Sequence, residues 1–130
     1  MRIVFERTAA EMAAKHASEA EIDVLENLNE QIEKASQDKA VAAAINQDFH
    51  RAIYLATRNR FLLESARALN NALMLLGPTT FVDADRISTV TRQHKDIIDA
   101  IRNGDSEAAG ASAEAHLQTS LRYRLSVLEK

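Results

Sequence analysis

The sequence contains no cysteine or tryptophan, a single proline and only three glycines among its 130 residues. Without cysteine the fold holds no disulfide, which fits a reducing cytoplasm, and we expect a cytoplasmic protein. The apolar runs are only a few residues long, far short of the roughly 20 that a membrane-spanning helix needs. The opening residues 1–6 also lack the apolar core and cleavage site of a signal peptide. The sequence therefore predicts no membrane partner and no export.

The chain also lacks a strong charge of either sign. Sixteen Lys and Arg residues stand against nineteen Asp and Glu residues, the net charge is -3, and no basic block stands out, so this polypeptide alone is a poor nucleic-acid binder. The length suits one domain over residues 1–130. A hydrophobic content of 46% with so few Gly and Pro residues favours helices, and an aromatic content of 5% predicts an aliphatic, alanine-rich core. We expect an all-α domain.

Helical periodicity and end signals predict a single antiparallel bundle of six helices. The expected helices cover residues 2–17, 19–36, 39–57, 61–76, a segment reaching 102, and 106–129. The start signals are a capping box from Ser18 to Glu21, Asp38 before the third helix, Asp83 or Asp85 before the fifth, and Asp105 before the sixth. The stop signals are Gly77-Pro78 and Asn103-Gly104. Residues 79–85 are expected to form a loop or an irregular extension of the fourth helix. The third helix should bury a stripe that runs from Val41 through Phe49 to Ala56.

Three of the four histidines and one asparagine lie on or beside the apolar faces of three predicted helices. Asn46 and His50 stand one turn apart on the third helix, so an amide oxygen and an imidazole can reach one point. His94 lies inside the stripe of the fifth helix, and His116 lies on the sixth. Because imidazole is a common ligand of transition metals, we predict a divalent metal ion in the bundle. Zinc or nickel suits this donor set better than calcium or magnesium, which prefer oxygen ligands.

A central cavity beside the ion is also expected. The residues three or four positions from His116 are small and lie on the same side of the helix. They leave room for an organic anion whose carboxylate would bind the ion. These residues are Ser112, Ala113, Thr119 and Ser120.

Each of these residues taken alone has a simpler interpretation. His94 in an apolar stripe is typical of a hydrogen-bonded core histidine, while His50 and His116 are typical of partly exposed surface histidines. Asn46 alone would be an amide on the helix surface. His16 lies near the end of the first helix, where it can interact with free carbonyls, and we assign it to the surface.

Several segments match one known protein family in order and separation. They are residues 2–6, which include Arg2 and Glu6; 46–50, Asn-Gln-Asp-Phe-His; 58–62, Arg-Asn-Arg-Phe-Leu; 93–101, which include His94; and 113–117, which include His116. Together they resemble the FadR C-terminal type (FCD) of effector-binding and dimerisation domain found in GntR-family bacterial transcription regulators. The resemblance extends over essentially all 130 residues.

The resemblance implies a ligand set for the metal ion. Position by position, the family's metal ligands fall on Asn46, His50, His94 and His116. Many members have aspartate where this sequence has Asn46. Asparagine brings the carbonyl oxygen without the negative charge, so we expect a lower metal affinity and a greater attraction for an anionic effector.

The resemblance also implies partners. The effector is expected to be a small organic acid, and Arg2 resembles an arginine in the family's first helix that serves as an anion contact. Arg67 and Asn70 on the fourth helix are further candidates, although a solvated face or a surface ion pair is the simpler interpretation of the arginines. Family members form homodimers and carry a winged-helix domain before this one, through which alone they contact DNA. We expect the chain to be part of such a longer regulator, with a stand-alone sensor domain as the alternative.

Two other functions stay open at this point. One is a metal-dependent enzyme that acts on a small organic acid, because three histidines with open positions also occur at catalytic zinc sites. The sequence holds no His-Glu-x-x-His motif, and no histidine has a glutamate three positions before it, so we expect a regulator and not an enzyme. The other is a dimerisation module with degenerate sensing, which analysis of bound metal would distinguish.

Overall fold

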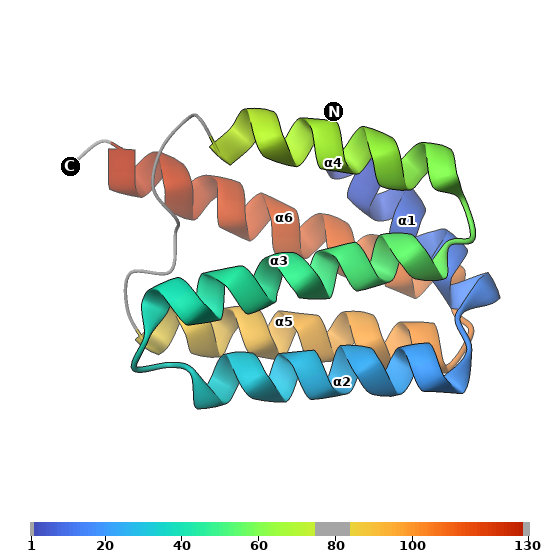
Figure 1. The fold of residues 1–130 in the computed structure, drawn as a ribbon, viewed down its shortest axis with the longest axis horizontal. Coiled ribbons are helices and arrows are strands. Elements are labelled where there is room, and N and C mark those ends of the chain that lie inside the picture. Colours follow the sequence, from blue (N-terminus) through green and yellow to red (C-terminus); the bar gives the residue numbers. More distant parts are fainter. Residues whose placement is uncertain (1, 75–83, 129–130) are drawn as a thin grey trace.

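The computed structural model describes residues 2–74 and 84–128, and within these ranges it contains six helices and no strand. They are α1 (Arg2–His16), α2 (Glu19–Lys34), α3 (Lys39–Ala56), α4 (Arg60–Met74), α5 (Ala84–Arg102) and α6 (Ser106–Leu128), as drawn in Figure 1. None of the helices in the described ranges is long and apolar enough to cross a membrane. The predicted all-α fold of six helices is confirmed.

Local polar signals set where several helices begin. The Ser18 side chain accepts the backbone N–H of Glu21, and the Glu21 side chain accepts the N–H of Ser18, which completes the predicted capping box. Asp38 and Asp105 each accept a backbone N–H three residues further on, at the starts of α3 and α6. Gly104 adopts a φ of 67°, so the chain turns between α5 and α6 without the steric cost that a side chain would bring.

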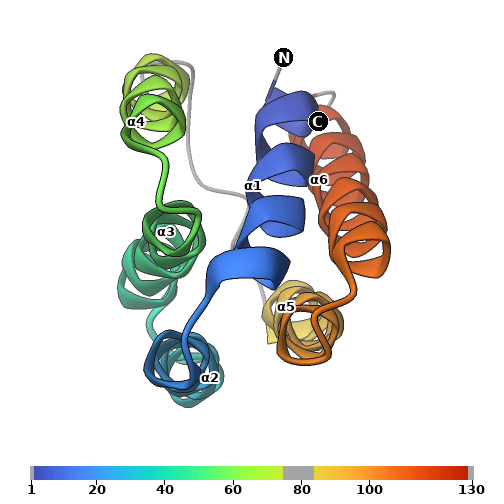
Figure 2. The same cartoon turned by 90° about the vertical axis from the view of Figure 1, so that its right-hand side faces the viewer.

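The helices form two groups whose apolar faces meet. Figure 2 shows α2, α3 and α4 stacked on one side, with α1, α5 and α6 on the other. Successive helices from α2 to α6 run in alternating directions, as an antiparallel bundle requires (Figure 1). The closest packing joins α1 to α6, α2 to α3 and α5, and α5 to α6. By contrast, α4 packs mainly on α3 and α1 and lies at the edge of the bundle.

The core is aliphatic and rich in alanine, as the composition predicted. Among its largest fully buried side chains are Phe49 on α3, Leu25 on α2 and Ile97 on α5. Small residues fill the contact between α1 and α6, which lets the two backbones approach closely. They are Ala9, Ala10, Ala13, Ala109, Gly110 and Ala113. This packing fixes α6, the helix that carries His116.

Some predicted details differ from the structure. Val41, expected in the buried stripe of α3, is 46% exposed, because the buried face runs through Ala42, Phe49 and Ile53. Asp85 does not cap α5, since that helix already begins one residue earlier. The described ends of the other helices agree with the predictions within two residues. The predicted end of α4 at residue 76, the stop at 77–78, the loop at 79–83 and the alternative cap at position 83 lie outside the described residues.

Candidate metal centre

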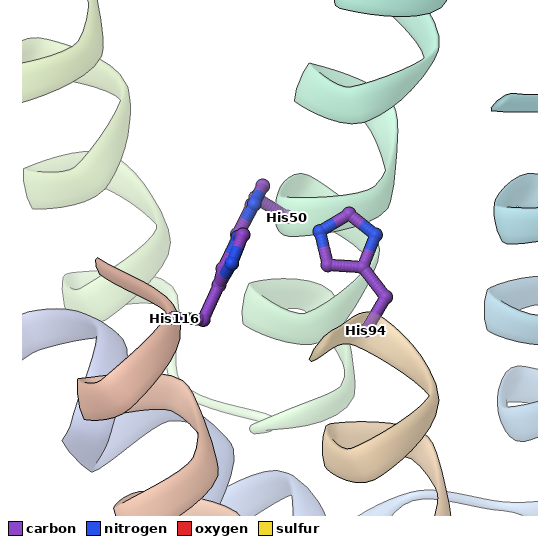
Figure 3. A group of neighbouring side chains, drawn as sticks. All are labelled: His50, His94 and His116. Atoms are coloured by element: carbon purple, nitrogen blue, oxygen red, sulfur yellow. The ribbon is translucent and has the colours of Figure 1, made fainter. Parts of the chain in front are cut away.

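Three histidines meet in the interior of the bundle. His50 comes from α3, His94 from α5 and His116 from α6, and Figure 3 shows their rings gathered in the space between these helices. Each ring offers one nitrogen, and these nitrogens all lie within 4.8 Å of one another. His94 is fully buried and His116 is 2% exposed. The fourth histidine, His16, is exposed, as predicted.

A buried asparagine on α2 orients the ring of His94. Asn29 Oδ1 lies 3.0 Å from His94 Nδ1, while the Asn29 amide nitrogen donates to the Thr91 carbonyl at 2.9 Å. Because that donor bond leaves Oδ1 facing the ring, His94 Nδ1 carries the proton and Nε2 keeps its lone pair. Phe49 stacks on the same ring with 3.9 Å between centroids. Within the described structure His94 Nε2 is buried without a hydrogen-bond partner, as a nitrogen held for a metal would be.

A glutamine on α5 orients the ring of His116 in the same way. Gln93 Oε1 lies 2.7 Å from His116 Nδ1, and the Gln93 amide nitrogen donates to Thr119 Oγ1 at 3.2 Å. The amide therefore presents its carbonyl to the ring, which leaves the proton on Nδ1 and the lone pair on Nε2. Thr119 thus supports the glutamine, and the neighbouring Ser120 accepts a hydrogen bond from Arg86.

Burial keeps both of these imidazoles neutral. It lowers the pKa of His94 well below its usual value, and the neighbouring His116, His50 and Arg86 lower that pKa further. Burial likewise lowers the pKa of His116, again with contributions from His50 and the arginines. Since the neutral ring is the form that binds a metal ion, both residues are competent ligands at neutral pH.

A cavity of about 160 Å³ adjoins His50 on the side of α1 and α4. Three other predicted site residues, Asn46, Arg2 and Arg67, line this cavity together with His50. Asn46 Oδ1 is buried and, within the described residues, has no hydrogen-bond partner. The side chain of Asn70, the remaining predicted contact, lies outside the described residues. None of the described lining residues comes from α6, so the described part of this cavity lies on the His50 side of the cluster and not beside the small residues of α6.

The sequence analysis did not identify the polar side chains that lie next to the Nδ1 atoms of the three imidazoles. Asn29 was identifiable, because it is a polar residue in the apolar stripe of α2, four positions after Leu25. Glu6 is a carboxylate only 6% exposed on α1, and its Oε1 lies 3.5 Å from Nδ1 of His50. Gln93 gave no signal, since an exposed helical glutamine and a buried hydrogen-bonding partner look alike in a sequence.

Comparison with known proteins assigns this sequence to one family. The FCD domain family matches residues 1–119, which include all the histidines of the cluster. The chain belongs to this family. The resemblance inferred from the sequence segments is therefore confirmed.

Relatives of this FCD domain are named as transcription regulators and not as enzymes. It is 27% identical over 134 residues to the HTH-type transcriptional regulator YdhC of Bacillus subtilis, a match covering 100% of this chain and 59% of the relative. It is 30% identical over 122 residues to the HTH-type transcriptional repressor NanR of Edwardsiella tarda, covering 92% and 46% of the two chains. NanR of Escherichia coli K12 is 28% identical over 121 residues, with the same coverage. The FCD domain thus spans about half the length of the relatives it matches.

The fold is also similar to that of a solved regulator. The GntR protein of Streptococcus agalactiae superposes with a TM-score of 0.76 at 23% identity, covering 93% of this chain and 54% of that one. At this identity the likeness concerns the fold alone. It confirms that the six helices form an arrangement found in GntR-type proteins.

Proposed function

We propose that this FCD domain senses a small organic acid by binding its carboxylate at a divalent transition metal ion. Asn46, His50, His94 and His116 would hold the ion. The convergence of three imidazoles, two of them buried and neutral, supports this proposal most strongly. A core that needed only to be filled would not leave a buried ring nitrogen and the Asn46 oxygen without hydrogen-bond partners among the described residues.

The donor set favours zinc or nickel. Three neutral ring nitrogens and one amide oxygen suit borderline transition ions, whereas calcium and magnesium prefer shells of oxygen. Two of the rings already have their lone pairs oriented by Asn29 and Gln93. When bound, the ion would supply a positive charge and open coordination positions for a carboxylate. Because none of the four donors is an anion, the ligands themselves do not neutralise that charge, which favours binding of an anionic effector.

The cavity beside His50 is the proposed effector site. Arg2 and Arg67 line it from α1 and α4, and guanidinium groups bind carboxylates through paired hydrogen bonds. We also assign Asn70 on α4 to this site. The cavity volume of about 160 Å³ is well below the roughly 300–1,000 Å³ of pockets for drug-sized ligands. A hydroxy acid, a sugar acid or a dicarboxylate is therefore the proposed class of effector.

Effector binding would act on DNA through the rest of a longer regulator. The relatives are named as HTH-type regulators, and about half of their length lies outside the match. We propose a cytoplasmic homodimer whose two arrangements present winged-helix domains differently. An effector that binds one arrangement more tightly shifts the population toward that arrangement. The free energy of this shift cannot exceed the difference between the effector's binding free energies for the two arrangements. Sedimentation tests the dimer, and a domain that stays monomeric at micromolar concentration contradicts it.

Metal content tests the ion site. Domain stripped with a chelator and reloaded with zinc or nickel should hold one ion per chain by elemental analysis. A His94→Ala/His116→Ala variant should hold none, whereas His16→Ala, which removes an exposed histidine, should bind like the unsubstituted chain. An unsubstituted domain that binds neither ion would contradict the metal site and favour a dimerisation module.

Thermal stability tests the effector. A ligand at 100 times its Kd stabilises the folded state by about 2.7 kcal/mol, which for a domain of this size raises Tm by about 10 °C. The rise should be larger for the metal-loaded domain than for the stripped one. A panel of organic acids that leaves Tm unchanged in both forms would contradict carboxylate sensing.

A further inference from the structure

Glu6 is a buried acid that faces the outer side of the metal centre. It lies on α1 and is only 6% exposed. Its Oε1 atom lies 3.5 Å from Nδ1 of His50 and 3.8 Å from Nε of Arg2. The carboxylate also lines the cavity beside His50. A buried carboxylate is costly unless charged or hydrogen-bonding partners surround it, so its position calls for an explanation.

Two neighbours hold this carboxylate in place. Arg2 stands one turn before Glu6 on α1 and provides a positive charge. Tyr54 on α3 is 4% exposed, and burial raises the pKa of its hydroxyl above the usual value. The charge of Glu6 and its hydrogen bond with the hydroxyl raise that pKa further. The phenol therefore stays protonated and can donate to Glu6 at all ordinary pH values.

The carboxylate approaches the same ring atom of His50 that is hydrogen-bonded in the other two histidines. Asn29 and Gln93 each place an oxygen within hydrogen-bond distance of Nδ1 of their histidine, whereas Glu6 Oε1 lies 3.5 Å from Nδ1 of His50 and forms a charge contact there without a hydrogen bond. The negative charge of a carboxylate beside Nδ1 favours the ring form that carries the proton on Nδ1 and keeps the lone pair on Nε2. Among the described residues, the group of potential metal ligands within 4.8 Å contains the three histidines and not Glu6, so we place Glu6 outside the ligand set.

The charge of Glu6 matters because the proposed ligands carry none. With asparagine at position 46, the four donor side chains are all neutral. We propose that Glu6 is a positioning residue that orients His50 and supplies a negative charge beside the metal ligands. This inference rests on the proposed metal-binding function. It explains how a site with Asn46 would hold a divalent cation with no anionic ligand.

The test measures zinc affinity by competition with a chromophoric chelator. Glu6→Gln keeps the size of the side chain and a hydrogen-bonding oxygen but removes the charge, and it should weaken zinc binding about 10–100-fold. Glu11→Gln is the matched control, because it removes a partly exposed carboxylate from the same helix. The control should bind zinc as the unsubstituted domain does. Equal zinc affinity in both variants and the unsubstituted domain would overturn the role of Glu6 and leave the metal site intact.

A double-mutant cycle tests the charge itself. In an Asn46→Asp background, where a ligand already carries a negative charge, the loss caused by Glu6→Gln should be at least about threefold smaller. The same loss in both backgrounds would overturn the claim that Glu6 supplies the charge. Failure of the unsubstituted domain to bind zinc would overturn this inference together with the proposed function.

The tautomer of the His50 ring provides a test that does not depend on bound metal. Long-range ¹H–¹⁵N spectra of the stripped, unsubstituted domain should show His50 with its proton on Nδ1, and Glu6→Gln should shift the population toward the Nε2–H form. A purely structural role for Glu6 would change stability without moving this equilibrium. Finding the Nε2–H form in the unsubstituted domain would overturn the proposal even if Glu6→Gln failed to fold.

Discussion

The buried amide of Asn29 links the fold to the candidate metal centre, and its removal should affect both. The side chain is 2% exposed and connects α2 to α5 through His94 Nδ1 and the Thr91 carbonyl. Leucine has a similar size but forms neither hydrogen bond. In Asn29→Leu the N–H of His94 would be a buried donor without an acceptor, which costs about 1–3 kcal/mol. We expect the free energy of unfolding to fall by about 2 kcal/mol.

This loss should be visible in two measurements. For a domain of this size, about 2 kcal/mol lowers Tm by roughly 6–10 °C, which circular dichroism of the metal-free protein can follow. Zinc affinity should fall about 10–100-fold, because a ring without its partner can rotate or exchange the proton between its nitrogens. The two effects have the same cause and should occur together.

The same substitution on the exposed face of α2 provides the control. Asn27→Leu should change the free energy of unfolding by less than about 0.5 kcal/mol and leave zinc affinity unchanged. If Asn29→Leu behaved like Asn27→Leu in both measurements, the assignment of Asn29 as the residue that orients His94 would be refuted.

Three further predictions concern the core, the pH response and the cavity. Phe49→Ala should cost about 3–5 kcal/mol in urea unfolding, because the ring is fully buried against His94, and a loss below about 1 kcal/mol would contradict that packing. Since the pKa values of His94 and His116 are lowered in the fold, the unfolded chain binds more protons, and the metal-free domain should lose about 1.4 kcal/mol per histidine for each pH unit below about 6.5. Urea unfolding between pH 5 and 7.5 checks this, and constant stability would be inconsistent with it. Arg67→Ala should reduce the rise of Tm caused by organic acids without changing zinc affinity, so an unaltered acid response would exclude Arg67 as an effector contact.

Features that depend on neighbouring residues were predictable from the sequence. The capping box at Ser18 and the caps at Asp38 and Asp105 each involve atoms three residues apart, so the sequence alone contains both partners. The turn at Gly104 was also predictable from local sequence, because its left-handed backbone conformation favours glycine. These signals defined the helix ends closely enough to count the elements.

The buried face of α3 was harder to predict, because residues 40–45 are apolar on every side. Periodicity indicates a face only where polar residues mark the opposite one, and this segment has none. The sequence pattern therefore predicts that Val41 belongs to the buried stripe of α3, whereas in the structure Val41 is exposed and Ala42 is buried. Phe49, which is flanked by polar residues, was placed correctly.

The convergence of the three histidines was predictable from the sequence, but their supporting contacts were not. The imidazoles lie in recognisable segments, and the structure shows that their nitrogens come together. Asn29 and His94 are 65 positions apart, and their contact depends on how α2 packs against α5. No local pattern specifies that packing, since it follows from the fit of whole helix faces.

The proposed metal centre and the proposed effector cavity share α1 and α3 but differ in their other helices. Asn29 from α2, Gln93 from α5 and Glu6 from α1 face rings carried by α3, α5 and α6, so five helices determine where the three nitrogens lie. Among the described side chains, none from α4 takes part in these contacts, and Leu63 and Arg67 of this helix instead form a wall of the cavity. Because α4 packs mainly on α1 and α3, substitutions on it can change the shape and charge of the cavity without moving the imidazoles. Under the proposed function, one arrangement of metal ligands would therefore serve different organic acids when only α4 changes.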